Sequence, residues 1–69
     1  MKVFWVDSYY WGADTDGLAD ILATEQLKSG IKSPATTQEI YSAIRNRIDR
    51  IDMNQSEEIC GKIITVRYN

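Results

Sequence analysis

One segment, Thr36 to Asp52, limits the possible folds more than any other part of the chain. Its apolar residues recur at steps of three and four, the spacing that places them on one face of a helix. These residues are Ile40, Tyr41, Ile44, Ile48 and Ile51. Isoleucine is a mediocre helix former because its branched Cβ loses rotamer freedom in a helix. We therefore predict a core helix that depends on packing its isoleucine face against the rest of the protein.

The start of this helix is marked more clearly than its end. Pro34 disfavours helical conformation at the residue before it. Thr36 and Glu39 have the spacing of a capping box, in which each side chain accepts a hydrogen bond from the other residue's backbone N–H. The apolar periodicity predicts that the helix continues to about Met53.

A second helix is predicted from the Asp14–Asp16 region to about Ser29. Asp14, Thr15 or Asp16 can cap its start, where the helix dipole also favours negative charge. Lys28 and Gly30 are typical of its end. Residues 31–35 are then a short connection. The predicted inner face consists of Leu18, Ala19, Leu22, Ala23 and Leu27.

Strand-forming residues lie at both ends of the chain. Val3–Val6 is a dense run of β-branched and aromatic residues, which predicts a strand buried on much of both faces. Tyr9–Trp11 is either a second strand after a turn at Asp7 and Ser8, or an irregular aromatic loop. The turn lacks the glycine that favours tight hairpins.

The C-terminal segment Ile59–Tyr68 predicts one long strand, with Ile64, Val66 and Tyr68 on its apolar face. Within it, Gly61 indicates a bulge or a close approach of another backbone. The preceding residues 54–58 are polar and favour a turn or a single helical turn.

These elements predict an α+β fold in which two helices pack on a small antiparallel sheet, in the order β-(β)-α-α-β. The chain of 69 residues is long enough for one domain, residues 1–69. Because two strands alone are marginal, the sheet needs either Tyr9–Trp11 as a third strand or strands from another subunit.

The composition narrows what can stabilise so short a chain, whose core supplies only about 3–5 kcal/mol of net stability. One cysteine excludes an intramolecular disulfide, and the lack of histidine argues against a zinc site. We therefore expect no metal and no cofactor. A partner chain, including a second copy in a homodimer, is the stabiliser that remains.

The charge of −2 argues against general affinity for nucleic acid, which requires Lys and Arg to neutralise phosphates. The only basic cluster, on the second helix, consists of Arg45, Arg47 and Arg50. Acidic residues on the same helix offset it, which favours a solvated, ion-paired surface. The alternative is a small dimeric nucleic-acid-binding regulator that uses these arginines. A strand followed by two helices resembles the ribbon-helix-helix order, but an apolar strand such as Val3–Val6 departs from that pattern.

Catalytic signatures are missing from the sequence. Nucleophilic catalysis usually needs a histidine base, and there is none. Cys60 is better explained as a small buried apolar residue within a strand than as a reactive thiol. Asp14 and Asp16 lie where helix caps belong, and the nearby residues do not supply the ligands of a calcium loop. We therefore predict a protein that is not an enzyme and has no small-molecule substrate.

No segment is long and apolar enough for a signal peptide core or a membrane helix, so we expect a soluble cytoplasmic protein without membrane contact.

The most unusual local feature is aromatic. Five of the seven aromatic residues lie between Phe4 and Trp11, more than a small core can easily enclose. Exposed Trp and Tyr are enriched at binding hot spots. The predicted partner-binding residues are Asp7, Tyr9, Tyr10, Trp11, Asp14 and Asp16.

The favoured hypothesis is a non-enzymatic protein-binding module that inhibits a larger protein or nucleoprotein complex by occluding it. In size and acidic composition the chain resembles the small inhibitors that phages and mobile elements encode, including anti-CRISPR proteins. No motif in the sequence identifies such a family.

Overall fold

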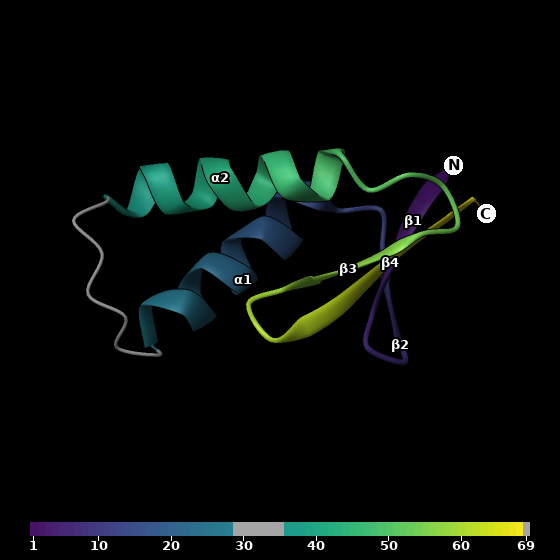
Figure 1. Ribbon diagram of the computed structural model, residues 1–69, viewed down its shortest axis with the longest axis horizontal. Helices are drawn as coiled ribbons and strands as arrows, with labels where there is room; N and C mark the ends of the chain where they lie inside the picture. Colours follow the sequence, from purple (N-terminus) through teal and green to yellow (C-terminus); the bar gives the residue numbers. More distant parts are fainter. Residues whose placement is uncertain (29–35, 69) are drawn as a thin grey trace.

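The computed structural model describes residues 1–28 and 36–68 and confirms the α+β fold, with two helices and an antiparallel sheet (Figure 1). The elements in chain order are β1 (Lys2–Val6), β2 (Tyr9–Gly12), α1 (Thr15–Lys28), α2 (Thr37–Asp49), β3 (Ser56–Ile59) and β4 (Lys62–Tyr68).

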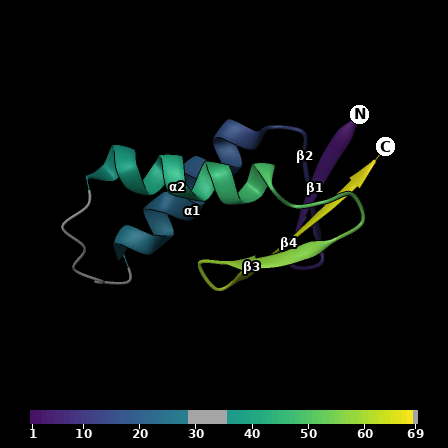
Figure 2. The ribbon, with the colours of Figure 1, turned by 45° about the horizontal axis from the view of Figure 1, so that its top comes forward.

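The sheet has the strand order β2-β1-β4-β3, and every neighbouring pair is antiparallel. The first and last strands are therefore its centre, and Figure 2 shows β1 and β4 side by side with both chain ends at one end of the sheet. Each is extended outward by a hairpin partner. The third strand is thus the predicted segment Tyr9–Trp11, which continues to Gly12. The fourth strand, β3, was not predicted.

Both helices pack on one face of this sheet. Phe4 from β1 and Ile64 from β4 are at most 1% exposed and belong to one apolar cluster with Leu22 of α1 and Ile48 of α2. Full burial of each such side chain contributes roughly 1.5–3 kcal/mol. The isoleucine face of α2 thus packs as its periodicity predicts.

The capping box at the start of α2 is confirmed. The Thr36 hydroxyl accepts from the Glu39 N–H at 3.2 Å, and the Glu39 carboxylate accepts from the Thr36 N–H at 3.3 Å.

The predicted end of α2 at Met53 is wrong, because the helix ends at Asp49. The Asn54 N–H donates to the carbonyl of Val66 at 2.8 Å, so the chain must already have turned towards the sheet. Ile51 stays in the core, 6% exposed, from outside the helix. The helical spacing therefore assigned Ile51 to the helix, although Ile51 reaches the core from the loop that follows it.

Helix α1 is capped by Asp14, whose carboxylate accepts from the Gly17 N–H at 2.9 Å. Its inner face is as predicted except at Leu27, which is 46% exposed in the last turn. The predicted residues Ser29 and Gly30 and the connection 31–35 lie outside the described residues.

The prediction of one long C-terminal strand is also wrong, because β3 and β4 form a hairpin around Cys60 and Gly61. Ile59 pairs with Lys62, and the two turn residues have φ of +52° and +78°. Two consecutive positive φ values are what a type I′ hairpin turn requires. Gly61 therefore marks a turn rather than a bulge, and Cys60 is not in a strand. The predicted apolar face also lacks Tyr68, which is 73% exposed.

The first hairpin forms without a turn glycine. Asp7 adopts a φ of +54° and is held by two contacts with Ile63 of β4. Its N–H donates to the Ile63 carbonyl at 2.7 Å, and its carboxylate accepts from the Ile63 N–H at 3.0 Å. These bonds compensate a backbone conformation that is costly for residues other than glycine.

Candidate functional site

The face of the sheet opposite the helices is the main candidate for a binding surface. Strand register places Trp5 beside Tyr10 on one side and Thr65 on the other, and it sets Val3 beside Arg67. Directly paired residues share a face, and these alternate with the core residues of β1 and β4. Val3 shares this face but is only 1% exposed. We call the set Trp5, Tyr10, Ile63, Thr65 and Arg67 the helix-free face.

An aromatic pair lies at one side of the helix-free face. The rings of Trp5 and Tyr10 are 5.4 Å apart between centroids, at 74° to each other. This edge-to-face geometry is favourable and limits the motion of both rings. Tyr10 is nevertheless 54% exposed, so a large part of a preorganised ring faces the solvent.

A shallow hollow of about 280 Å³ adjoins this pair and is lined by Trp5, Asp7, Thr65 and Arg67. It offers an aromatic wall, a hydroxyl, a guanidinium and a carboxylate. The Asp7 carboxylate is held in place by its bond to the Ile63 N–H. The hollow can therefore accept polar groups of either charge beside an apolar ring.

The structure separates the aromatic residues that the sequence grouped together. Tyr9 is 79% exposed and pairs with Val6, which places it on the helix side at the sheet's edge. Trp11 turns inward, packs against the core and donates its indole N–H to the Asp14 carbonyl at 3.0 Å. Only Tyr10 of the three contributes to the helix-free face.

Two predicted acidic residues have structural partners. Asp14 caps α1, as described above. Asp16 forms an ion pair with Arg45 of α2 and accepts from the Tyr41 hydroxyl at 3.2 Å. The hydrogen bond with Tyr41, and then the charge of Asp16, raise the pKa of Arg45. These contacts connect the two helices.

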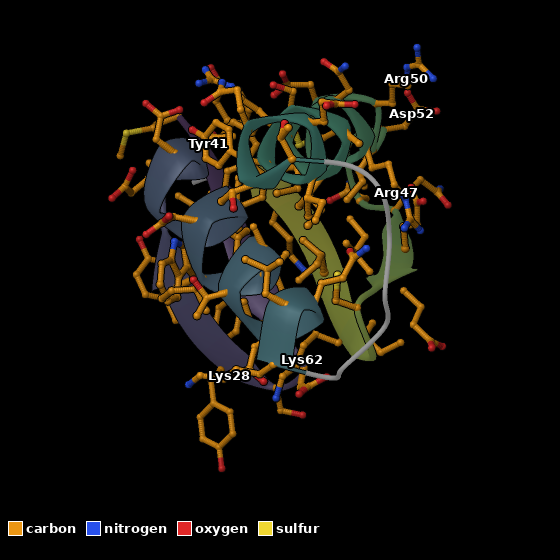
Figure 3. All side chains as sticks on the ribbon, turned by 90° about the vertical axis from the view of Figure 1, so that its left-hand side faces the viewer. Lys28, Tyr41, Arg47, Arg50, Asp52 and Lys62 are labelled. Carbon is orange, nitrogen blue, oxygen red and sulfur yellow. The ribbon has the colours of Figure 1, made fainter. Side chains whose placement is uncertain are left out.

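The three arginines of the alternative hypothesis do not act as one cluster. Arg45 turns towards α1 through Asp16. Arg47 turns towards β3, where it contacts the Glu57 carboxylate at 2.9 Å. The Arg50 side chain has no hydrogen bond or ion pair within the described ranges, and Figure 3 shows it extending outward near Asp52. Only Arg50 is left for a phosphate without breaking an existing contact.

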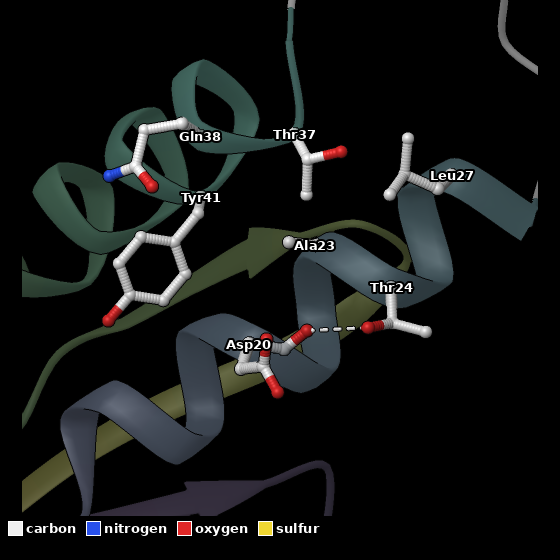
Figure 4. Close-up of a pocket in the computed structure, with 7 residues that line it drawn as sticks. All are labelled: Asp20, Ala23, Thr24, Leu27, Thr37, Gln38 and Tyr41. Atoms are coloured by element: carbon white, nitrogen blue, oxygen red, sulfur yellow. Dashed lines mark hydrogen bonds between the residues drawn. The ribbon is translucent and has the colours of Figure 1, made fainter.

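A second hollow of about 270 Å³ lies between the helices (Figure 4). Its lining residues are Asp20, Ala23, Thr24, Leu27, Thr37, Gln38 and Tyr41. The Thr24 hydroxyl already donates to the Asp20 carbonyl at 2.9 Å. Across residues 1–28 and 36–68, no group of three or more potential ligand side chains could hold a metal ion.

Cys60 is a poor candidate for a nucleophile. It is half-buried, and its thiol donates to the Gln26 side-chain oxygen at 3.3 Å. Burial raises the pKa of Cys60, and the charge of Arg47 only partly opposes that effect. Because the thiolate is the reactive form, the folded environment suppresses its reactivity at neutral pH.

Trp5, Thr65 and Arg67 are surface residues of this site that the sequence did not predict. Side chains alternate between the two faces of a strand, so Trp5, Thr65 and Arg67 lie on the face opposite to Phe4, Ile64 and Val66. This alternation is the signal that could have grouped the three residues. Alternation does not say which face the helices cover, and it does not reveal that β1 and β4 are neighbours.

The chain matches no protein-family model, no curated protein and no solved structure. Within the described part of the chain, neither helix is long and apolar enough to cross a membrane.

Proposed function

We propose that this protein is a non-enzymatic protein-binding module that uses the helix-free face as the contact surface. The observation that carries the proposal is the half-exposed Tyr10 ring fixed against Trp5 beside the hollow. Tyr, Trp and Arg are the residue types enriched at binding hot spots. Here one of each lies on the same sheet face.

The rigidity of this surface supports the proposal. Ordering a flexible side chain on binding costs about 0.5–1.5 kcal/mol. The Trp5–Tyr10 pair is already ordered, and Arg67 comes from a central strand. A partner that docks here therefore avoids part of that cost.

The proposed mode of action is steric. A chain of 69 residues that places aromatic and charged groups on a rigid sheet can cover a functional surface of a larger protein or nucleoprotein complex. Phage and mobile-element inhibitors of the anti-CRISPR type can act in this steric way, which requires no chemical reaction by the inhibitor. We place this activity in the cytoplasm, where such targets occur.

Affinity capture from the native cell, followed by mass spectrometry, tests the proposal. We expect one protein assembly to be enriched by the wild-type chain and lost, by about tenfold or more, with Tyr10→Ala or Arg67→Ala. The matched control is Tyr68→Ala, because Tyr68 is 73% exposed but lies on the other parity of β4. Thermal unfolding must show that all three variants remain folded.

Two results would overturn the proposal. Capture that is equal for wild type, Tyr10→Ala and Arg67→Ala would remove the helix-free face from the interface. Recovery of nucleic acid, with binding that weakens steeply with salt and depends on Arg50, would favour the regulator hypothesis instead.

A further inference from the structure

The two edge strands of the sheet differ in how they are protected. An edge strand exposes unpaired N–H and C=O groups to which another strand can add. The edges here are β2 and β3. Natural sheets protect such edges with charged side chains, by covering them, or with short strands and bulges, and the two edges here are protected in different ways.

The β3 edge is protected by charge and by a side chain from α2. The strand contains Glu57 and Glu58. Arg47 reaches over it and donates to the outward carbonyl of Glu58 at 2.7 Å. It also holds the Glu57 carboxylate through two donors, at 2.9 and 3.0 Å. A strand approaching β3 would have to displace this guanidinium.

The β2 edge has no charged residue, and its protection comes from its short length and from the bulge at Trp11. Its sequence is Tyr9-Tyr10-Trp11-Gly12, without a charged residue. The Asp7 N–H bonds to β4, so by the antiparallel alternation Val6 presents its backbone to β2. Tyr9 is the partner of Val6, and the backbone N–H and C=O of Tyr10 therefore point away from the sheet.

We propose that this edge pairs with the β2 edge of a second copy of the chain, antiparallel and centred on Tyr10. The pairing is self-complementary, because each copy offers one donor and one acceptor at the same residue, as a two-fold axis requires. The axis would set Tyr9 opposite the second copy's Trp11, and no like charges would meet directly.

The resulting dimer has one continuous sheet of eight strands, twice the four of a single copy. Its helices lie on one side, and the two Trp5–Tyr10 pairs lie next to each other on the other side. The contact is short. Trp11 has no partner in β1 because the register shifts there, and Gly12 has a φ of +117°. This bulge limits the pairing to the residues around Tyr10, so the dimer is weak and reversible.

Sedimentation equilibrium of the purified chain over an about hundredfold concentration range tests the pairing. We expect a concentration-dependent monomer–dimer equilibrium. Tyr10→Pro removes the outward N–H, together with the ring that packs on Trp5, at an edge position where proline is tolerated, and it should weaken dimerisation by about tenfold or more. Tyr10→Lys keeps the backbone, adds charge to the edge and should have a similar effect.

The matched control is Glu58→Pro on the opposite edge. Glu58 is next to the hairpin-closing residue of β3, as Tyr10 is in β2, and its carbonyl remains available to Arg47. This variant should dimerise like wild type. Hydrogen exchange should show the Tyr10 amide of wild type protected only at concentrations where the dimer forms.

A chain that stays monomeric across the whole range would overturn the inference, as would a dimer that Tyr10→Pro and Tyr10→Lys leave unchanged. A dimer that Glu58→Pro weakens and Tyr10→Pro leaves intact would assign the contact to the other edge. The assay contains no target, so each of these outcomes leaves the proposed protein-binding function standing.

Discussion

Replacing Arg47 with alanine should destabilise the protein by about 1–1.5 kcal/mol. The guanidinium connects α2 to β3 by two bonds to the Glu57 carboxylate and one to the Glu58 carbonyl. The paired side chains are 47% and 40% exposed, so water and salt weaken the ion pair to about 0.5 kcal/mol. The bond to the carbonyl adds about 1 kcal/mol at most, because water can replace it.

A double-mutant cycle separates these two contributions. Urea unfolding of wild type, Arg47→Ala, Glu57→Ala and the double variant should give a coupling energy of about 0.5 kcal/mol. About 1 M salt should abolish this coupling, because it shortens the screening length to about 3 Å. The remaining loss in Arg47→Ala reports the bond to the Glu58 carbonyl and should persist in salt.

Arg47→Lys is the conservative control. Lysine keeps the charge but cannot hold the carboxylate and the carbonyl together as the planar guanidinium does. Arg47→Lys should therefore recover the salt-dependent part of the lost unfolding free energy, but not the part that comes from the bond to the Glu58 carbonyl. The assigned role of Arg47 at β3 is wrong if the free energy of unfolding of Arg47→Ala lies within about 0.3 kcal/mol of the wild-type value. It is also wrong if salt removes the whole difference in stability between the two proteins.

Three further predictions follow from burial, capping and ionisation. Ile48→Ala, at a fully buried position, should cost about 2–5 kcal/mol and leave the chain largely unfolded by circular dichroism. Ile63→Ala, at a position that is 42% exposed, should stay within about 0.5 kcal/mol of wild type, and an equal loss in both would contradict the assigned core. Thr36→Ala should cost about 1 kcal/mol and lower the melting temperature by about 4–8 °C, whereas an unchanged melting temperature would argue against the capping box. Burial raises the pKa of Cys60 above its ordinary 9.0, so the folded chain keeps a proton that the unfolded chain releases. Its contribution to stability is therefore complete below about pH 9 and declines as the pH rises through the folded-state pKa. Urea midpoints should fall more between pH 8 and pH 10 in wild type than in Cys60→Ala, by about a few tenths of a molar, and parallel curves would refute this.

Local patterns predicted most of the fold. The capping box at Thr36, the cap at Asp14 and the isoleucine face of α2 all depend on neighbours within one or two turns. Such contacts are encoded by spacing in the sequence. The errors occur where a long-range contact overrides a local pattern. Asn54 bonds to Val66, which ends α2 early and initiates the strand that was missed.

The candidate site was predictable only in part. Tyr10 is predicted as a binding residue because it belongs to a dense aromatic cluster in the sequence, and it is half-exposed in the structure. Trp11 was grouped with it, but the bulge and the bond to the Asp14 carbonyl place Trp11 against the core. Thr65 is distant in sequence and joins the site because β4 lies beside β1. No pattern among neighbouring residues in the sequence indicates that β1 pairs with β4.

The sequence by itself determined the two helices, the strand-forming character of both chain ends and the lack of histidine or paired cysteines, because these follow from residue types and short spacings. Tertiary structure alone decided which sheet face the helices cover, which strands are central and which edge stays open. Those outcomes depend on backbone hydrogen bonds between segments far apart in the chain, such as that from Asp7 to Ile63. Backbone groups are the same at every residue, so the sequence does not state which strands they join.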